Sequence, residues 1–228
     1  MKKRSFMILA VTASLIMSAC GSTTDKGASS TAASVSSSEA APANGKWIEP
    51  DEKQKSAIME ADTMLMLMTE TGDEDYNAED PEFFWKSIHY MIGNNMDLCK
   101  AEGPEGNDIF FRVDKDIVQD CAAALFAGCT ELKEIPAGMK DVYVDPDDSE
   151  KYCMNAGDRG ASESRMGLWK DNGDGTYTAV IGLYATDEDD VMINTGTFVF
   201  TDNTYSAGDG EPVFPYALKS VEITKLTD

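Results

Sequence analysis

The chain has few basic residues and a single histidine. It carries 19 Lys and Arg residues against 41 Asp and Glu residues, which gives a formal net charge of -22. A surface this acidic repels phosphate backbones, so nucleic-acid binding is excluded as a function class. His89 is the one histidine, which excludes zinc enzymes of the His-Glu-x-x-His type because these need two.

The patterns that mark common enzyme classes are also missing. The sequence holds no Gly-x-Ser-x-Gly, Walker, Rossmann or Ser-x-x-Lys pattern, which disfavours the usual hydrolases, nucleotide enzymes and penicillin-binding proteins. A Cys–His dyad would depend on His89, whose helical position beside Tyr90 is typical of a packed or surface residue. We therefore predict that the protein is not an enzyme and that it uses no cofactor, with calcium as the one alternative.

The N-terminal 20 residues have the order of an export signal. Three basic residues at 2–4 precede an apolar run at 6–17, which is too short to span a bilayer but suits a signal peptide. The segment Met17-Ser18-Ala19-Cys20 follows and resembles the lipobox of bacterial lipoproteins. The resemblance implies cleavage before Cys20 and a diacylglyceryl group on its sulfur, a stable two-chain anchor. An ordinary signal peptide or a short anchor helix is the alternative.

This interpretation divides the chain into three parts. Residues 1–19 form the predicted signal peptide. Residues 20–45 form the lipidated Cys20 and a Ser- and Ala-rich tether, which has no apolar periodicity to offset its ordering entropy. Residues 46–228 form a single globular domain, since 183 residues suffice for one hydrophobic core. The predicted location is extracytoplasmic, on the outer face of the bacterial membrane, and the predicted state is a monomer.

Apolar periodicity predicts helices in the first part of the domain and strands in the second. Asp80 and Pro81 are typical of a helix start and Gly72 of a helix end. The alternation in the last strand slips near residues 219–220, which predicts a bulge or a bend. The predicted helices cover 50–72, 80–93 and 114–128, and the predicted strands cover 109–113, 142–144, 151–154, 164–170, 176–185, 191–200 and 213–226.

This order predicts an α+β fold: a helical hairpin plus a third helix packed on a curved, mainly antiparallel sheet of five or six strands. We expect the hairpin helices to be antiparallel. Over residues 50–226 the element order resembles that of the cystatin-like and SnoaL-like α+β roll. The resemblance implies a concave sheet face that holds a pocket in some members and packs solid in others, and it implies no particular chemistry.

The loop at 171–175 resembles part of a calcium site through Asp171 and Asp174. Aligned to an EF-hand, the loop has no acidic residue at positions 1 and 12, where calcium ligands stand. Asn-Gly and Asp-Gly pairs are typical of hairpin turns, so we favour a turn. Calcium binding stays open for this loop and for acidic clusters that converge in space, at 73–75, 145–150 and 187–190.

Four cysteines follow Cys20, and none is part of a Cys-x-x-Cys pair. Zinc sites commonly bring ligands in close pairs, so a metal site is disfavoured. An exported protein can form disulfides, and four cysteines allow three pairings. Cys121 also fits a buried free thiol in the predicted core. The candidates for a disulfide are Cys99, Cys121, Cys129 and Cys153.

The segment 155–160 brackets Asp158 and Arg159 with glycines. Arg159 suits the binding of a ligand carboxylate or phosphate, and a local ion pair with Asp158 is the alternative. We also consider Arg165 and Trp169 as ligand-binding residues, in a sheet-face pocket completed by Tyr152 and Tyr177.

Three hypotheses for function follow. The first is a membrane-anchored, non-enzymatic binding or interaction module of the cell envelope, whose partner is an unknown envelope protein or a small ligand. The second is a small-molecule-binding or enzymatic α+β roll with a pocket on the concave sheet face. The third is a calcium-stabilised surface module.

Overall fold

Capping interactions fix the ends of the helices. The computed structural model describes residues 45–72, 75–104, 109–156, 160–186, 191–208 and 210–225. The Asp80 side chain accepts a hydrogen bond of 2.8 Å from the backbone N–H of Glu82 and starts a helix, as predicted. Gly72 ends the preceding helix in the left-handed conformation. The described helices are α1 (Glu52–Lys55), α2 (Ile58–Thr71), α3 (Pro81–Asn94) and α4 (Lys115–Leu125).

The structure confirms the α+β class, and its described strands form two antiparallel sheets. The larger sheet has the order β4-β5-β6-β7 and the smaller the order β1-β3-β2, where one sheet of five or six strands is predicted. The strands are β1 (Phe110–Asp114), β2 (Val142–Val144), β3 (Lys151–Asn155), β4 (Ser162–Asp171), β5 (Thr176–Ala185), β6 (Met192–Asp202) and β7 (Tyr216–Lys225).

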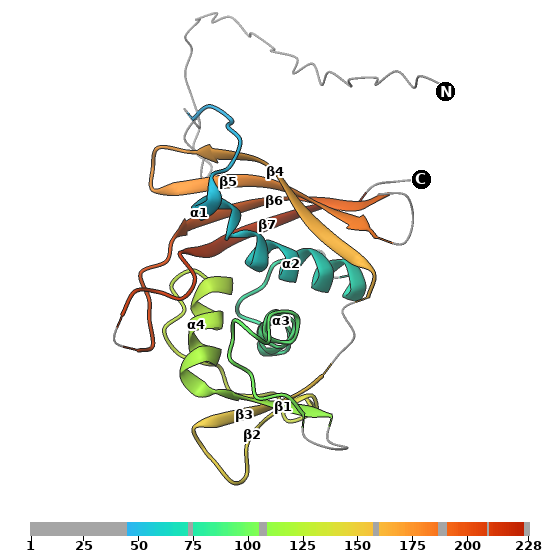
Figure 1. Ribbon diagram of the computed structural model, residues 1–228, viewed down its shortest axis with the longest axis vertical. Helices are drawn as coiled ribbons and strands as arrows, with labels where there is room; N and C mark the ends of the chain where they lie inside the picture. The colour runs from blue at the N-terminus through green and yellow to red at the C-terminus, as the bar shows by residue number, and fades with distance from the viewer. Residues whose placement is uncertain are drawn as a thin grey trace, which may run out of the picture. The chain divides into compact units, whose positions relative to one another are not determined.

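Helices α2, α3 and α4 lie between the two sheets (Figure 1). α2 packs across all four strands of the larger sheet, and α3 packs on both α2 and α4. Ring contacts of Trp85 with Tyr152 and of His89 with Phe111 join α3 to the smaller sheet. α3 is seen end-on in Figure 1 and α2 from the side, so the two helices cross, whereas an antiparallel hairpin is predicted.

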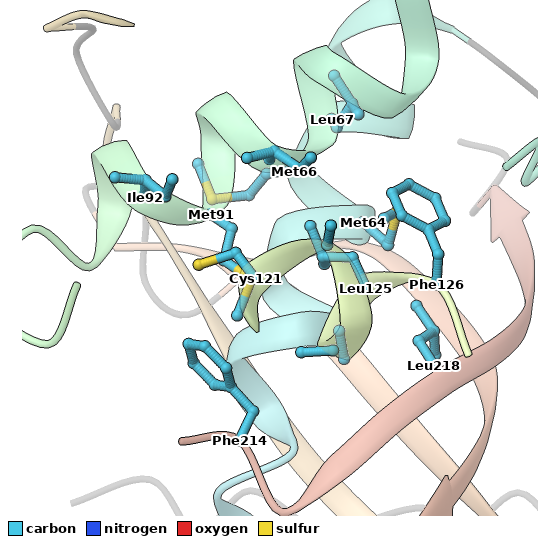
Figure 2. Packing of buried hydrophobic residues seen from close by; sticks show 14 of the residues in the cluster. Met64, Met66, Leu67, Met91, Ile92, Cys121, Leu125, Phe126, Phe214 and Leu218 are labelled. Atoms are coloured by element: carbon cyan, nitrogen blue, oxygen red, sulfur yellow. The ribbon is translucent and has the colours of Figure 1, made fainter. Parts of the chain in front are cut away.

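The burial pattern explains the second sheet. Every residue from Val118 to Leu125 on α4 is buried, as is every residue from Glu60 to Met68 on α2. A helix that is buried all round must be covered on more than one side. Figure 2 shows side chains from α2, α3, α4 and β7 meeting in this core, among them Met64, Met91, Leu125 and Leu218.

The predicted irregularity in the last strand is present. Val199 of β6 pairs with Ser220 and Phe200 pairs with Leu218, so Lys219 is an extra residue in β7. One added residue reverses the alternation of side chains between the two faces of the sheet, and this accounts for the slip in the sequence. Among the described residues, no helix is long and apolar enough to cross a membrane.

Candidate functional site

Polar side chains from separate parts of the fold surround a cavity of about 380 Å³. The last turns of α2 supply Glu70 and Thr71, and the loop before β2 supplies Asp141. α3 supplies His89, and the end of β3 supplies Asn155. We call this space the His89 cavity. Its other walls include Lys86, Tyr90, Gly93 and Asn94 on α3.

The imidazole of His89 is held in one orientation. Its Nε2 lies 2.7 Å from the backbone carbonyl oxygen of Asn155. A carbonyl oxygen can only accept, so Nε2 carries the hydrogen, and in the neutral ring Nδ1 is the acceptor. The ring centroid lies 6.4 Å from that of Phe111 on β1. The hydrogen bond and the contact with Phe111 therefore fix the position of the His89 ring in the wall of the cavity.

A second polar link joins α3 to α2. The hydroxyl of Tyr90 donates a short hydrogen bond to the carboxylate of Glu70. Burial, and secondarily the hydrogen bond and negative charge of Glu70, raise the pKa of Tyr90. The phenol therefore stays protonated and leaves Glu70 as a hydrogen-bonded carboxylate in the wall of the cavity.

The remaining wall is fixed by the contact of Asn155 with Asp141. The side-chain amide of Asn155 donates to Oδ1 of Asp141 at 2.8 Å. The backbone N–H of Asn155 also donates to the carbonyl oxygen of Asp141 at 3.0 Å. These two bonds join the segment before β2 to the end of β3.

The His89 cavity is rich in hydrogen-bond acceptors. Two carboxylates, those of Glu70 and Asp141, line it together with the ring of His89. The one lysine in the wall, Lys86, lies 2.8 Å from a carboxylate oxygen of Glu82. The arrangement therefore favours a ligand that donates hydrogen bonds and repels one with net negative charge.

Another groove of about 490 Å³ runs beside α4. Its walls mix both signs of charge, with Lys115 and Lys133 beside Asp116 and Glu134. This groove is more open to solvent than the His89 cavity. Because enclosure is what removes ligand surface from water, the His89 cavity is the stronger candidate.

The structure does not bring the predicted ligand-binding residues together. Trp169 is fully buried and stacks on Tyr177 and Phe200, with ring centroids 5.5 and 5.6 Å apart. The guanidinium of Arg165 instead lies over the ring of Tyr184, 4.5 Å from its centroid.

Arg165 and Trp169 also point to opposite faces of the sheet. Their partners on β5 are Gly182 and Ala179, three residues apart, because a bulge interrupts β4 between Met166 and Leu168. Tyr152 lies in the smaller sheet, against Trp85. Asp158 and Arg159 lie outside the described residues.

The predicted calcium residues cap a hairpin turn. Asp171 accepts a hydrogen bond from the backbone N–H of Gly173 at 2.7 Å. Asp174 accepts from the backbone N–H and the hydroxyl of Thr176, at 3.0 and 2.6 Å. These bonds, with the Thr176 hydroxyl first, lower the pKa of Asp174. Within the described ranges, no cluster of three His, Cys, Asp or Glu side chains is arranged to hold a metal ion.

The four cysteines of the domain are free thiols in this structure. Cys99, Cys121 and Cys153 are buried, and Cys129 is half-buried. Cys99 and Cys121 are in contact, with their Sγ atoms 3.8 Å apart. Residues 1–44, which include Cys20 and the predicted lipobox, lie outside the described part of the chain.

Comparisons with protein-family models, with curated proteins and with solved structures found no match to this chain. The candidate site therefore depends on geometry alone. Sequence reasoning treated His89 only as a packed or surface residue and did not identify the cavity. The sequence pattern that indicates the cavity is the spacing of Lys86, His89, Tyr90 and Gly93. This spacing places polar side chains, and a glycine that has no side chain, on one face of a helix.

Proposed function

We propose that this protein is a lipid-anchored, extracytoplasmic binding module of the bacterial cell envelope, and that the His89 cavity holds its ligand. The observation that carries the proposal is the convergence of α2, α3 and the smaller sheet on one partly enclosed space of about 380 Å³. A volume in this range suits a small organic molecule. The resemblance of residues 17–20 to a lipobox supports the anchor.

The walls of the cavity favour a small molecule that is rich in hydrogen-bond donors and carries no net negative charge. Amines and polyols belong to this class, because their N–H and O–H groups can donate to the carboxylates of Glu70 and Asp141 in the wall. A carboxylate ligand meets two like charges in the wall and the overall charge of -22.

We propose a binding module as the class, with an enzyme that uses the same pocket as the alternative. Among the described residues, His89 makes one hydrogen bond, to a backbone carbonyl oxygen, and none to a hydroxyl or a thiol. Nucleophilic catalysis needs a base within hydrogen-bonding reach of its nucleophile.

The ligand proposal is tested by thermal denaturation with three matched sugars. Glucosamine, glucose and glucuronate share a ring and differ in charge, and a ligand that binds only the folded state raises the melting temperature. We expect a rise in the order glucosamine, glucose, glucuronate at millimolar concentrations, and no rise in a Gly93→Leu variant whose cavity is filled. A larger rise with glucuronate, or equal rises in the variant, would contradict the proposed ligand class.

The anchor is tested separately in a bacterial host that lipidates its own lipoproteins. The wild-type chain should incorporate labelled palmitate and sediment with membranes, whereas a Cys20→Ala variant should do neither. A matched Cys129→Ala variant should behave as the wild type. Membrane association that persists without label in the Cys20→Ala variant would instead indicate an uncleaved anchor helix.

A further inference from the structure

Two cysteines from different elements touch in the core. Sγ of Cys99 and Sγ of Cys121 are 3.8 Å apart, and the exposed fractions of the two residues are 1% and 0%. A disulfide has an S–S length of about 2.05 Å, so a further approach of roughly 1.8 Å brings the sulfur atoms to bonding distance. We propose that Cys99 and Cys121 form an intramolecular disulfide when the chain folds in the presence of a thiol–disulfide oxidant.

Backbone hydrogen bonds close the turn that carries Cys99. The N–H of Cys99 donates to the carbonyl oxygen of Asn95 at 2.9 Å, and the N–H of Ala101 donates to that of Met96 at 2.9 Å. Within this turn, Lys100 has a φ of 49°, a left-handed conformation that a lysine seldom adopts.

Cys121 provides the second thiol of this contact. It lies within α4, and Figure 2 shows it among the buried side chains that α2 and α3 contribute to the core. All the residues that follow it up to Leu125 are buried as well. Cys121 is therefore held by a rigid helix, and the turn after α3 is the element that must adjust to close the bond.

The other two cysteines are engaged elsewhere. Sγ of Cys129 donates to the carbonyl oxygen of Glu131 at 3.4 Å. Sγ of Cys153 donates to the carboxylate of Asp145 at 3.5 Å. The geometry therefore favours a single bond, between Cys99 and Cys121, and leaves Cys129 and Cys153 as free thiols.

The oxidant is a small disulfide such as oxidised glutathione, or the disulfide of an oxidoreductase. One cysteine thiolate attacks this disulfide, and the first thiol of the oxidant leaves. The second cysteine thiolate then attacks the protein sulfur of the mixed disulfide and releases the second thiol. The protein loses two protons and two electrons, and the oxidant gains them as two thiols.

The disulfide forms during folding and not in the folded protein. The hydrogen bond with Cys99, together with burial, raises the pKa of the Cys121 thiol, so the reactive thiolate is scarce in the folded state. The thiols are accessible only before the core closes. Exported proteins fold in compartments that supply such oxidants, but the pairing itself depends neither on the lipid anchor nor on the His89 cavity.

The test is to refold the full chain from denaturant in reduced and oxidised glutathione, block free thiols, and map the peptides by mass spectrometry. Trypsin leaves Cys99 in peptide 87–100 and leaves Cys121 with Cys129 in peptide 116–133, so a second cleavage after Phe126 is needed to separate them. We expect a Cys99–Cys121 crosslink, with Cys129 and Cys153 carrying the blocking group. A Cys129→Ala variant should keep the crosslink and a Cys121→Ala variant should lose it. Natively folded wild-type protein with blocked Cys99 and Cys121, or with either paired to Cys129 or Cys153, would overturn the proposal.

A thermal measurement gives a second readout. The bond would close a loop between residues 22 positions apart, and oxidation should raise the melting temperature by roughly 6–12 °C. The Cys129→Ala variant should show the same rise. The Cys99→Ala/Cys121→Ala double variant should show none, and a rise that persists in that variant would contradict the proposed pair.

Discussion

Nε2 of His89 donates a hydrogen bond to the backbone carbonyl oxygen of Asn155, 2.7 Å away and 66 residues further along the chain. This bond ties α3 to the end of β3 and sets the imidazole in the wall of the cavity. The single histidine of the chain therefore links two elements of the fold, and its ring lies where a ligand in the cavity would contact it.

The first prediction concerns the free energy contributed by this link. His89→Ala removes the hydrogen bond and leaves the carbonyl of Asn155 without it, so the free energy of unfolding should fall by about 1–3 kcal/mol. His89→Gln keeps a side-chain donor and should lose less. Urea denaturation measures both values. Equal losses in the two variants would show that the bond contributes nothing beyond the volume of the ring.

The second prediction concerns Gly93, which leaves part of the cavity empty. A Cβ atom added to Gly93 meets no atom within 4 Å outside its own helix turn. Gly93→Ala should raise the free energy of unfolding by roughly 0.5–1 kcal/mol, since alanine is the better helix former. Gly93→Leu should fold as stably and fill the space. Stability is measured by denaturant titration, and a marked destabilisation of Gly93→Ala would show that the site is tightly packed and not open.

The third prediction concerns Glu60, which is fully buried on α2. Neither carboxylate oxygen has a hydrogen-bond partner. Burial raises the pKa of Glu60 from an ordinary value of 4.5 to about 8. Glu60 lies near α4, where its charge acts to raise the pKa of the Cys121 thiol.

The sign of the effect of Glu60 on stability follows from these values. Below about pH 4.5 the carboxyl is protonated in both states, and between pH 4.5 and 8 the unfolded chain ionises while the folded protein keeps its proton. The free energy of unfolding should therefore fall as pH rises through this window. Glu60→Gln should remove this part of the slope, as denaturant titrations at pH 5 and pH 8 would reveal. An unchanged slope in the variant would assign the pH dependence to the other carboxylates.

The fourth prediction concerns calcium. The side chains of Asp171 and Asp174 already accept hydrogen bonds from the turn that they flank. We therefore expect the melting temperature to be the same with millimolar calcium and with a chelator. A calcium-dependent rise that disappears in an Asp174→Ala variant would instead establish a site at this turn.

Local features of the fold could be predicted because neighbouring residues determine them. The cap at Asp80, the left-handed Gly72 and the extra residue at Lys219 all follow from short sequence patterns. The division into two sheets did not follow. Alternation along β1 shows which side chains share a face, but it does not show that β1 pairs with β3, some 40 residues away.

The candidate site was hidden for related reasons. Arg165 and Trp169 are four residues apart, which places them on one face of a regular strand, but the bulge in β4 separates them. His89 does pack against Phe111, as a packed residue would. Its partner Asn155 belongs to a distant strand, so only the tertiary structure brings these groups to one cavity.

The measurement that tests the central proposal most directly is the NMR spectrum of the His89 imidazole, which gives one set of side-chain signals because the chain has one histidine. Small amines, polyols and carboxylates of matched size are added to isotope-labelled protein at millimolar concentrations. We predict that amines and polyols shift the imidazole signals of the wild type more than carboxylates do, and that the Gly93→Leu variant shows no shift. Signals that no compound moves, or that move equally in the filled variant, would contradict ligand binding in the His89 cavity.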